Sequence, residues 1–219
     1  MKGNYVMKKL IILCLNFCLC LVILTGCGTS KEVKKLTAED IQTFSTQLNT
    51  DPLSGEIVLN GIKYSLPIKA KSLEDNGFKY NDYADKGQSL KNGYYVDLIK
   101  MDDGSKSEES RISVTIFNTS GDQMKFEDAM IGGIEIDKTN DSYKNTIVLP
   151  KGITLASTYE DIIKAYGKPQ LDALDQTGLV SYISKESNGR YGQELLFKFD
   201  KDKKVLKSIN LKNIPQNKK

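Results

Sequence analysis

The side chains of this 219-residue chain that could do chemistry are thiols, carboxylates and lysines, because the sequence contains no histidine and no tryptophan. Without an imidazole, one copy of the chain cannot form a Ser-His-Asp or Cys-His catalytic site, a histidine zinc ligand or a histidine pH switch. The S-x-x-K and G-x-S-x-G motifs and glycine-rich phosphate loops are also missing from the sequence. We therefore expect no catalytic residue, no metal site and no cofactor.

All four cysteines lie within the first 27 residues. Three lysines precede an apolar run over residues 10–24, which ends in the quartet Leu24-Thr25-Gly26-Cys27. A basic, an apolar and a small-residue segment in this order are typical of a secretory signal, whether the chain starts at Met1 or at Met7. The quartet resembles the lipobox of bacterial lipoproteins, which implies that Cys27 receives diacylglycerol and that the signal, residues 1–26, is cut just before it.

The leader also explains the net charge. Its three lysines account for the formal charge of +3, so the remaining chain is neutral, with arginine only at Arg111 and Arg190. A neutral chain without a basic stripe predicts no nucleic-acid binding.

Two acyl chains on one cysteine would hold the protein firmly on the extracytoplasmic face of the cell membrane. The alternative is an uncleaved anchor, although the apolar run is shorter than the ~20 residues of a membrane span. The lysine-rich composition is typical of a low-GC Gram-positive source.

The carboxylates offer weaker candidates. Residues 200–204, Asp-Lys-Asp-Lys-Lys, resemble the start of a calcium loop, but lysines stand where ligands are needed, which favours a hairpin turn. The pairs Asp102-Asp103 and Glu108-Glu109 could bind a cation, but we expect a solvated loop. A carboxylate-dependent cell-wall hydrolase stays an alternative, because two facing carboxylates would suffice for it.

The elements that must position these groups follow from apolar periodicity. Residues 27–36 are predicted to be a flexible tether, and residues 37–50 an amphipathic helix region, with Thr37 and Asp40 capping the helix over residues 37–48. We expect its apolar stripe to pack onto the domain, not onto a partner or the lipid surface. Asn60-Gly61 is typical of a type I′ hairpin turn. A short helix over residues 72–76 and strands over 94–101, 111–118 and 130–137 follow.

The second half repeats this order. Ser157-Thr158-Tyr159-Glu160 is predicted to be a capping box that starts a helix ending at Gly167. Strands are expected over residues 179–184, 193–200 and 205–211. The order predicts one α+β domain over residues 55–212, built from repeats at about 55–138 and 147–212, with a tail over 213–219.

The alternation of polar and apolar residues predicts how the sheet sits. Residues 112, 114 and 116 are apolar, while the residues between them are mostly polar, which indicates an antiparallel sheet with one face on a core and one in water. We expect the helices on one face. Tyr95, Phe117 and Tyr182 are candidates for the water-facing side, where aromatic rings could bind a sugar or a protein.

Residues 149–169, from Leu149-Pro150 to Gly167-Lys168-Pro169, carry a family resemblance. They resemble the helix entry of Gram-positive surface lipoproteins of unknown function, which are similar to the tandem-repeat fold of beta-lactamase inhibitory protein and to SmpA/OmlA-type lipoproteins. Ala156 stands where that pattern often has glycine. The resemblance implies a non-enzymatic protein-binding or scaffolding module, with an envelope protein or a cell-wall component as partner. A carbohydrate-binding role is the alternative.

Overall fold

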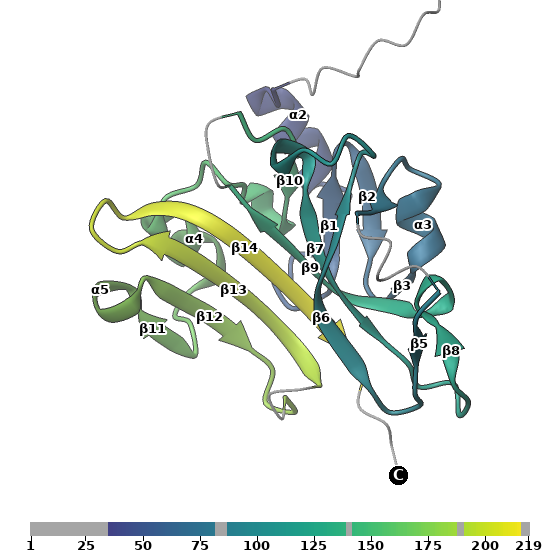
Figure 1. Cartoon of the computed structure of the whole chain (residues 1–219). Coiled ribbons are helices and arrows are strands. Elements are labelled where there is room, and N and C mark those ends of the chain that lie inside the picture. The colour runs from purple at the N-terminus through teal and green to yellow at the C-terminus, as the bar shows by residue number, and fades with distance from the viewer. Residues whose placement is uncertain (1–34, 82–86, 139–141, 188–190, 216–219) are drawn as a thin grey trace, which may run out of the picture. The chain divides into compact units, whose positions relative to one another are not determined.

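The largest element of the computed structural model is an antiparallel sheet of nine described strands (Figure 1). The structure describes residues 35–81, 87–138, 142–187 and 191–215. Eight strands follow the order β11-β12-β13-β14-β9-β7-β6-β4, and β3 pairs with β9 outside this path. The bounds are β3 Ile68–Lys69, β4 Lys79–Tyr80, β6 Tyr95–Asp102, β7 Ile112–Phe117, β9 Met130–Asp137, β11 Leu171–Ala173, β12 Leu179–Ile183, β13 Gly192–Asp200 and β14 Val205–Ile214. Helices combined with a large antiparallel sheet confirm the predicted α+β class.

Strands from the two halves of the sequence meet at one junction in this sheet. The pair β14 and β9 joins them, with Ile209 opposite Ile136 and Leu211 opposite Ile134. Apolar side chains directly opposite each other in an antiparallel pair share a face. These cross-strand pairs therefore give the two halves one continuous buried surface.

A smaller sheet carries the predicted hairpin. Its strands β10 (Ile147–Val148), β1 (Glu56–Leu59) and β2 (Ile62–Ser65) lie in that order, and β5 (Ser89–Leu90) pairs separately with β8 (Met124–Lys125). Asn60 and Gly61 join β1 to β2 with φ of 51° and 81°. Positive φ at both central residues is what a type I′ turn requires, so the Asn-Gly prediction is confirmed.

Helix α2 (Ala38–Ser45) packs against this smaller sheet. The hydroxyl of Thr37 accepts a hydrogen bond from the backbone of Asp40, and the Asp40 carboxylate accepts one from the backbone of Thr37, which is the predicted capping box. Ile41 and Phe44 pack on a cluster of Leu48, Val58 and Val148. The stripe therefore packs onto the domain, as the sequence predicts. Leu36 also packs on this cluster, although it was predicted to belong to the flexible tether over residues 27–36. The tether therefore ends before Leu36.

The N-cap of helix α4 (Tyr159–Tyr166) lies one residue later than predicted. This cap is Thr158, whose hydroxyl accepts from the Asp161 backbone while the Asp161 carboxylate accepts from that of Thr158. Ser157 instead accepts from the backbone of Thr154 at 3.0 Å, which closes the preceding turn. The prediction was wrong by one residue because two overlapping stretches each have a hydroxyl followed three residues later by an acid. The helix ends at Gly167, as predicted, with φ of 77°.

One hydrophobic cluster fills the space between the large sheet and the other elements. It contains Leu73 of α3 (Ala70–Glu74), Ile162 of α4 and Leu174 of α5 (Leu174–Thr177), together with Phe197 and Ile134 of the large sheet. The residues that the structure describes form one compact unit.

The ends of the chain bear on several predictions. Strand β14 continues to Ile214, which is buried, so the predicted tail at residues 213–219 starts too early. The amide of Asn213 donates to the Leu66 carbonyl at 2.7 Å, which holds this end of the strand. The signal, Cys27 and most of the tether lie outside the described residues. Within the described ranges, no helix is both long enough and apolar enough to span a membrane.

Candidate binding face

Two of the three aromatic residues predicted for the water-facing side are buried, so that prediction was wrong for Phe117 and Tyr182. Tyr182 lies opposite Leu195, which belongs to the core, and its ring contacts that of Tyr166 with centroids 5.5 Å apart. The Tyr182 hydroxyl donates to the Gly167 carbonyl at 2.7 Å. The register between β12 and β13 therefore turns Tyr182 towards the core.

Phe117 is buried for a different reason. The register of β7 against β9 shifts between Thr115 and Ile116, which leaves Gly132 of β9 as an extra residue without a partner on β7. The ring then closes over Gly132, where a Cβ atom would lie 2.9 Å from Phe117 Cδ1 and 2.6 Å from Ile214 Cγ1. Phe117 therefore lies on the same face as Thr115 and its cross-strand partner Tyr95, but packing against Gly132 and Ile214, which the alternation of the sequence does not reveal, buries it there.

Tyr95, the third candidate, is half-buried and lines a pocket on the polar face of the large sheet. We define this face by the side chains of Ser113, Thr115, Glu135, Glu194, Ser208 and Asn210. The pocket has a volume of about 280 Å³ and crosses five neighbouring strands. This polar pocket is lined by Tyr95, Asp97, Leu98, Ser113, Val114, Thr115, Glu135, Glu194, Leu196, Asn210 and Lys212.

Glu135 organises the floor of the polar pocket. Its Oε1 lies 2.6 Å from Lys198 Nζ and accepts from the Ser208 hydroxyl at 3.2 Å, while its Oε2 accepts from the Asn210 amide at 3.3 Å. The carboxylate is buried, and a buried charge is tolerated only when it is paired and hydrogen-bonded. Three donors from β13 and β14 meet that requirement.

Glu135 is not among the predicted site residues, although the sequence carries a signal for it. A single acid stands in the otherwise uncharged stretch MIGGIE of β9, and an isolated acid in such a strand predicts a buried network. A second pair, Glu194 and Lys212, lies nearby with 3.0 Å between Oε2 and Nζ. Ser181 donates to the other oxygen of Glu194 at 3.1 Å.

Side chains of β6 and β7 also form hydrogen bonds with each other in the lining of the pocket. The Thr115 hydroxyl donates to Asp97 at 2.6 Å, and Lys100 Nζ donates to the Ser113 hydroxyl at 2.6 Å. Both hydroxyls lie on a strand whose six residues are all buried. The expectation that the second face of β7 lies in water was therefore wrong, because neighbouring polar side chains cover it.

Leu98 is the most unusual residue at the rim of the pocket. It has φ of 62° and lies where the register of β6 against β7 shifts, between Val96 and Ile99. Leu98 is 59% exposed, and Tyr94, directly before the strand, is 61% exposed. A left-handed backbone is unfavourable for a leucine, and such strain is concentrated at functional sites.

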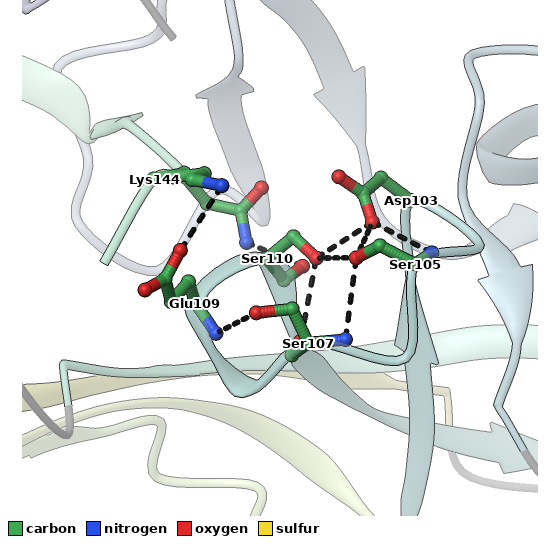
Figure 2. Close-up of polar contacts among 7 residues, drawn as sticks. Asp103, Ser105, Ser107, Glu109, Ser110 and Lys144 are labelled. Atoms are coloured by element: carbon green, nitrogen blue, oxygen red, sulfur yellow. Dashed lines mark hydrogen bonds and ion pairs between the residues drawn. The ribbon is translucent and has the colours of Figure 1, made fainter. Parts of the chain in front are cut away.

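The Asp102–Glu109 region is a structured loop, not the fully solvated one expected. Asp103 Oδ1 accepts from the hydroxyls of Ser105 and Ser110, and Lys144 Nζ lies 3.0 Å from Glu109 (Figure 2). Partial burial opposes ionisation of Asp103, but the hydrogen bonds from Ser105 and Ser110 outweigh it and hold the pKa of this carboxyl below its usual value. Asp102 is buried, and its Oδ1 accepts from the Gly104 backbone at 2.7 Å.

The other acidic candidate is the turn between β13 and β14. Asp200 Oδ1 accepts from the backbones of Asp202 and Lys203 at 3.1 and 3.0 Å, so the carboxylate closes the turn. These bonds hold the Asp200 pKa below its usual value. The prediction of a hairpin turn is confirmed. Among the described residues, no group of three or more acidic or thiol side chains is arranged to hold a metal ion.

Comparison with known proteins adds no further assignment. No protein-family model, no curated protein and no solved structure matches this chain. The polar pocket and its rim at Leu98 are therefore the features on which a function must be argued.

Proposed function

We propose that the protein is a lipoprotein held on the extracytoplasmic face of the cell membrane through diacylglycerol on Cys27, where it acts as a non-enzymatic protein-binding or scaffolding module. The leader and the quartet Leu24-Thr25-Gly26-Cys27 support the anchor. Replacing Cys27 by alanine is expected to abolish metabolic labelling with a fatty acid and to release the protein from membranes. Labelling that persists in Cys27→Ala would contradict the anchor.

The observation that best supports the binding role is that Leu98 combines a left-handed backbone with an exposed side chain. An exposed apolar side chain on a strained backbone has a cost and no packing benefit within the chain, so a partner that covers it supplies the missing benefit. Tyr94, directly before this strand, adds a second exposed side chain. Large side chains surrounded by polar groups are typical of the energetic centre of protein interfaces.

The arrangement of the domain supports the same role. We interpret the two halves, residues 55–138 and 147–212, as repeats joined through β9 and β14, with their helices on the core face. This interpretation rests on the element order and on the resemblance to the tandem-repeat lipoproteins, in which a sheet face and loops bind other proteins. Within the pocket, Glu135 and Glu194 each contact a lysine within 3.0 Å, which suits a fixed binding surface better than proton transfer.

Photocrosslinking in living cells tests the protein-binding role. A photoreactive phenylalanine analogue at position 94 is expected to capture a discrete envelope protein, and Leu98→Asn is expected to reduce that capture at least tenfold. Asparagine tolerates the left-handed backbone, so this change removes the apolar anchor and keeps the conformation. Leu171→Asn is the matched control, because Leu171 is also exposed, at 42%, but lies on the distant edge strand β11.

Two outcomes would contradict the proposal. The first is equal capture in Leu98→Asn and Leu171→Asn. The second is turnover of purified cell-wall fragments that is lost in Glu135→Gln, which would instead favour the carboxylate-dependent hydrolase.

A further inference from the structure

We propose that the polar pocket binds a neutral saccharide unit, a ligand that the proposed protein-binding role does not include. The site is the hollow between β6 and β13 whose floor carries Thr115, Glu135 and Asn210. It lies beside Leu98, so one face of the sheet would present a sugar pocket and a protein anchor next to each other.

The charges of the pocket favour a ligand without net charge. Three carboxylates, Asp97, Glu135 and Glu194, are matched by three lysines that contact pocket residues, Lys100, Lys198 and Lys212. Glu135 and Glu194 each lie within 3.0 Å of an ammonium group. A charged ligand would have to compete with these pairs and leave one partner uncompensated, which is costly in a partly buried site.

The remaining hydrogen-bonding capacity suits hydroxyl groups. The Ser113 hydroxyl accepts from Lys100, so its own proton is available for donation. The Thr115 hydroxyl donates to Asp97 and can still accept, and Asn210 donates its amide to Glu135 and keeps a carbonyl oxygen that can accept. Donors and acceptors thus occur together in the lining of the pocket. A sugar hydroxyl both donates and accepts, so it satisfies either kind of group.

The apolar part of the wall suits the C–H side of a sugar ring. Tyr95, Leu98 and Leu196 contribute this part. The ring of Tyr95 is held edge-on by that of Tyr191, with centroids 6.4 Å apart, and the Tyr191 hydroxyl donates to the Gly93 carbonyl at 2.9 Å. A ring fixed in advance loses little conformational freedom on binding.

The size of the pocket limits the ligand. A volume of about 280 Å³ lies just below the roughly 300–1,000 Å³ of small-molecule sites. The pocket therefore suits a monosaccharide or a disaccharide within a longer glycan.

Methyl NMR of the full chain, in a detergent without a sugar headgroup, tests the proposal. The leucine methyls of Leu98 and Leu196 report on the pocket, and those of Leu48 and Leu73 report on distant parts of the core. The probes are glucose, N-acetylglucosamine and its β-1,4-linked disaccharide, with glucosamine and glucuronate as cationic and anionic matches to glucose. We expect the neutral sugars to shift the pocket methyls alone, and the two charged sugars to bind at least tenfold more weakly.

Thr115→Val tests the floor of the pocket, because it removes the hydroxyl and keeps the shape of the side chain. We expect it to weaken binding of the neutral sugars at least fivefold, whereas Thr43→Val on the exposed part of α2 leaves binding unchanged. Unperturbed Leu48 and Leu73 methyls in both variants show that the fold is retained.

Three results would overturn the saccharide proposal: pocket methyls that do not respond to any neutral sugar, charged sugars that bind as tightly as glucose, or unchanged affinity in Thr115→Val. Any of these combined with crosslinking that depends on Leu98 would leave the protein-binding role standing and reject only the sugar. Sugar binding without such crosslinking would reject the protein-binding role instead.

Discussion

The two faces of the large sheet exclude water by different interactions. On the core face, Ile134 and Phe197 pack among apolar side chains from the helices and the smaller sheet. On the polar face, Glu135 is held by Lys198, Ser208 and Asn210 through directional bonds. Apolar packing fills space, whereas a network of hydrogen bonds fixes groups around a hollow without filling it. The polar face can therefore keep a pocket of fixed shape that the core face could not.

The largest expected effect comes from creating a cavity on the core face of the sheet. Phe197 is fully buried and its ring lies 6.4 Å from those of Tyr166 and Tyr182. Phe197→Ala is expected to lower the free energy of unfolding by about 3–5 kcal/mol, measured by urea denaturation. Phe197→Leu should cost clearly less because it leaves a smaller cavity. Equal losses in the two variants would show that packing does not hold this face.

An alkaline pH titration sharpens the comparison, because Tyr182 places a phenol on the core face. Burial raises the pKa of Tyr182 to about 12, above the ordinary value of 10.0. The folded state then keeps a proton that the unfolded state loses, so this stabilisation is complete below pH 10 and is lost as the pH rises to about 12. The loss amounts to about 2–3 kcal/mol.

The measurement is unfolding by urea at several pH values between 9 and about 12, for the wild type and for Tyr182→Phe. The phenylalanine variant should show a shallower decline over this range, since it has no proton to lose at this position. Parallel declines in both proteins would contradict burial of the Tyr182 phenol.

Removing the centre of the polar network should cost less than opening the core. Glu135→Ala leaves the buried hydroxyl of Ser208 and the amide of Asn210 without their acceptor, so we expect a loss of about 1–3 kcal/mol. Glu108→Ala removes an exposed carboxylate whose pair with Arg111 spans 3.2 Å, and about 0–1 kcal/mol is expected there. Chemical denaturation of both variants compares them directly. An equally small effect in both would mean that the polar face is not held by Glu135.

The smallest effect concerns the helix that packs Ile162 into the core. Thr158→Ala removes the cap of α4 and should cost about 1 kcal/mol, whereas Thr158→Ser keeps a hydroxyl at that position and should cost much less. Thermal unfolding of the two variants provides the measurement. If Ser157→Ala lowers the stability more than Thr158→Ala does, then Ser157 is the N-cap, as the sequence pattern predicted.

Much of the fold could be predicted from local patterns. The Asn60-Gly61 turn, the Thr37 cap and the strand over residues 130–137 follow from chemistry within a few residues, and the structure confirms each. Where two local patterns compete, as at Ser157 and Thr158, the sequence offers no means of choosing. The extension of β14 to Ile214 follows from its pairing with Gly192 of β13, and the Ile214 side chain packs beside Gly132, which lies far away along the chain.

The candidate site was less predictable, because it depends on which face each strand turns to the core. The sequence by itself determined the antiparallel α+β class, the longer strands and the alternation that divides each strand into two faces. Only the tertiary structure decided that Tyr182 and Phe117 are buried, that Tyr95 lines a pocket and that Glu135 is held by two other strands. The physical reason is that cross-strand register and β-bulges assign the faces, and both are set by contacts between segments that are distant in the sequence.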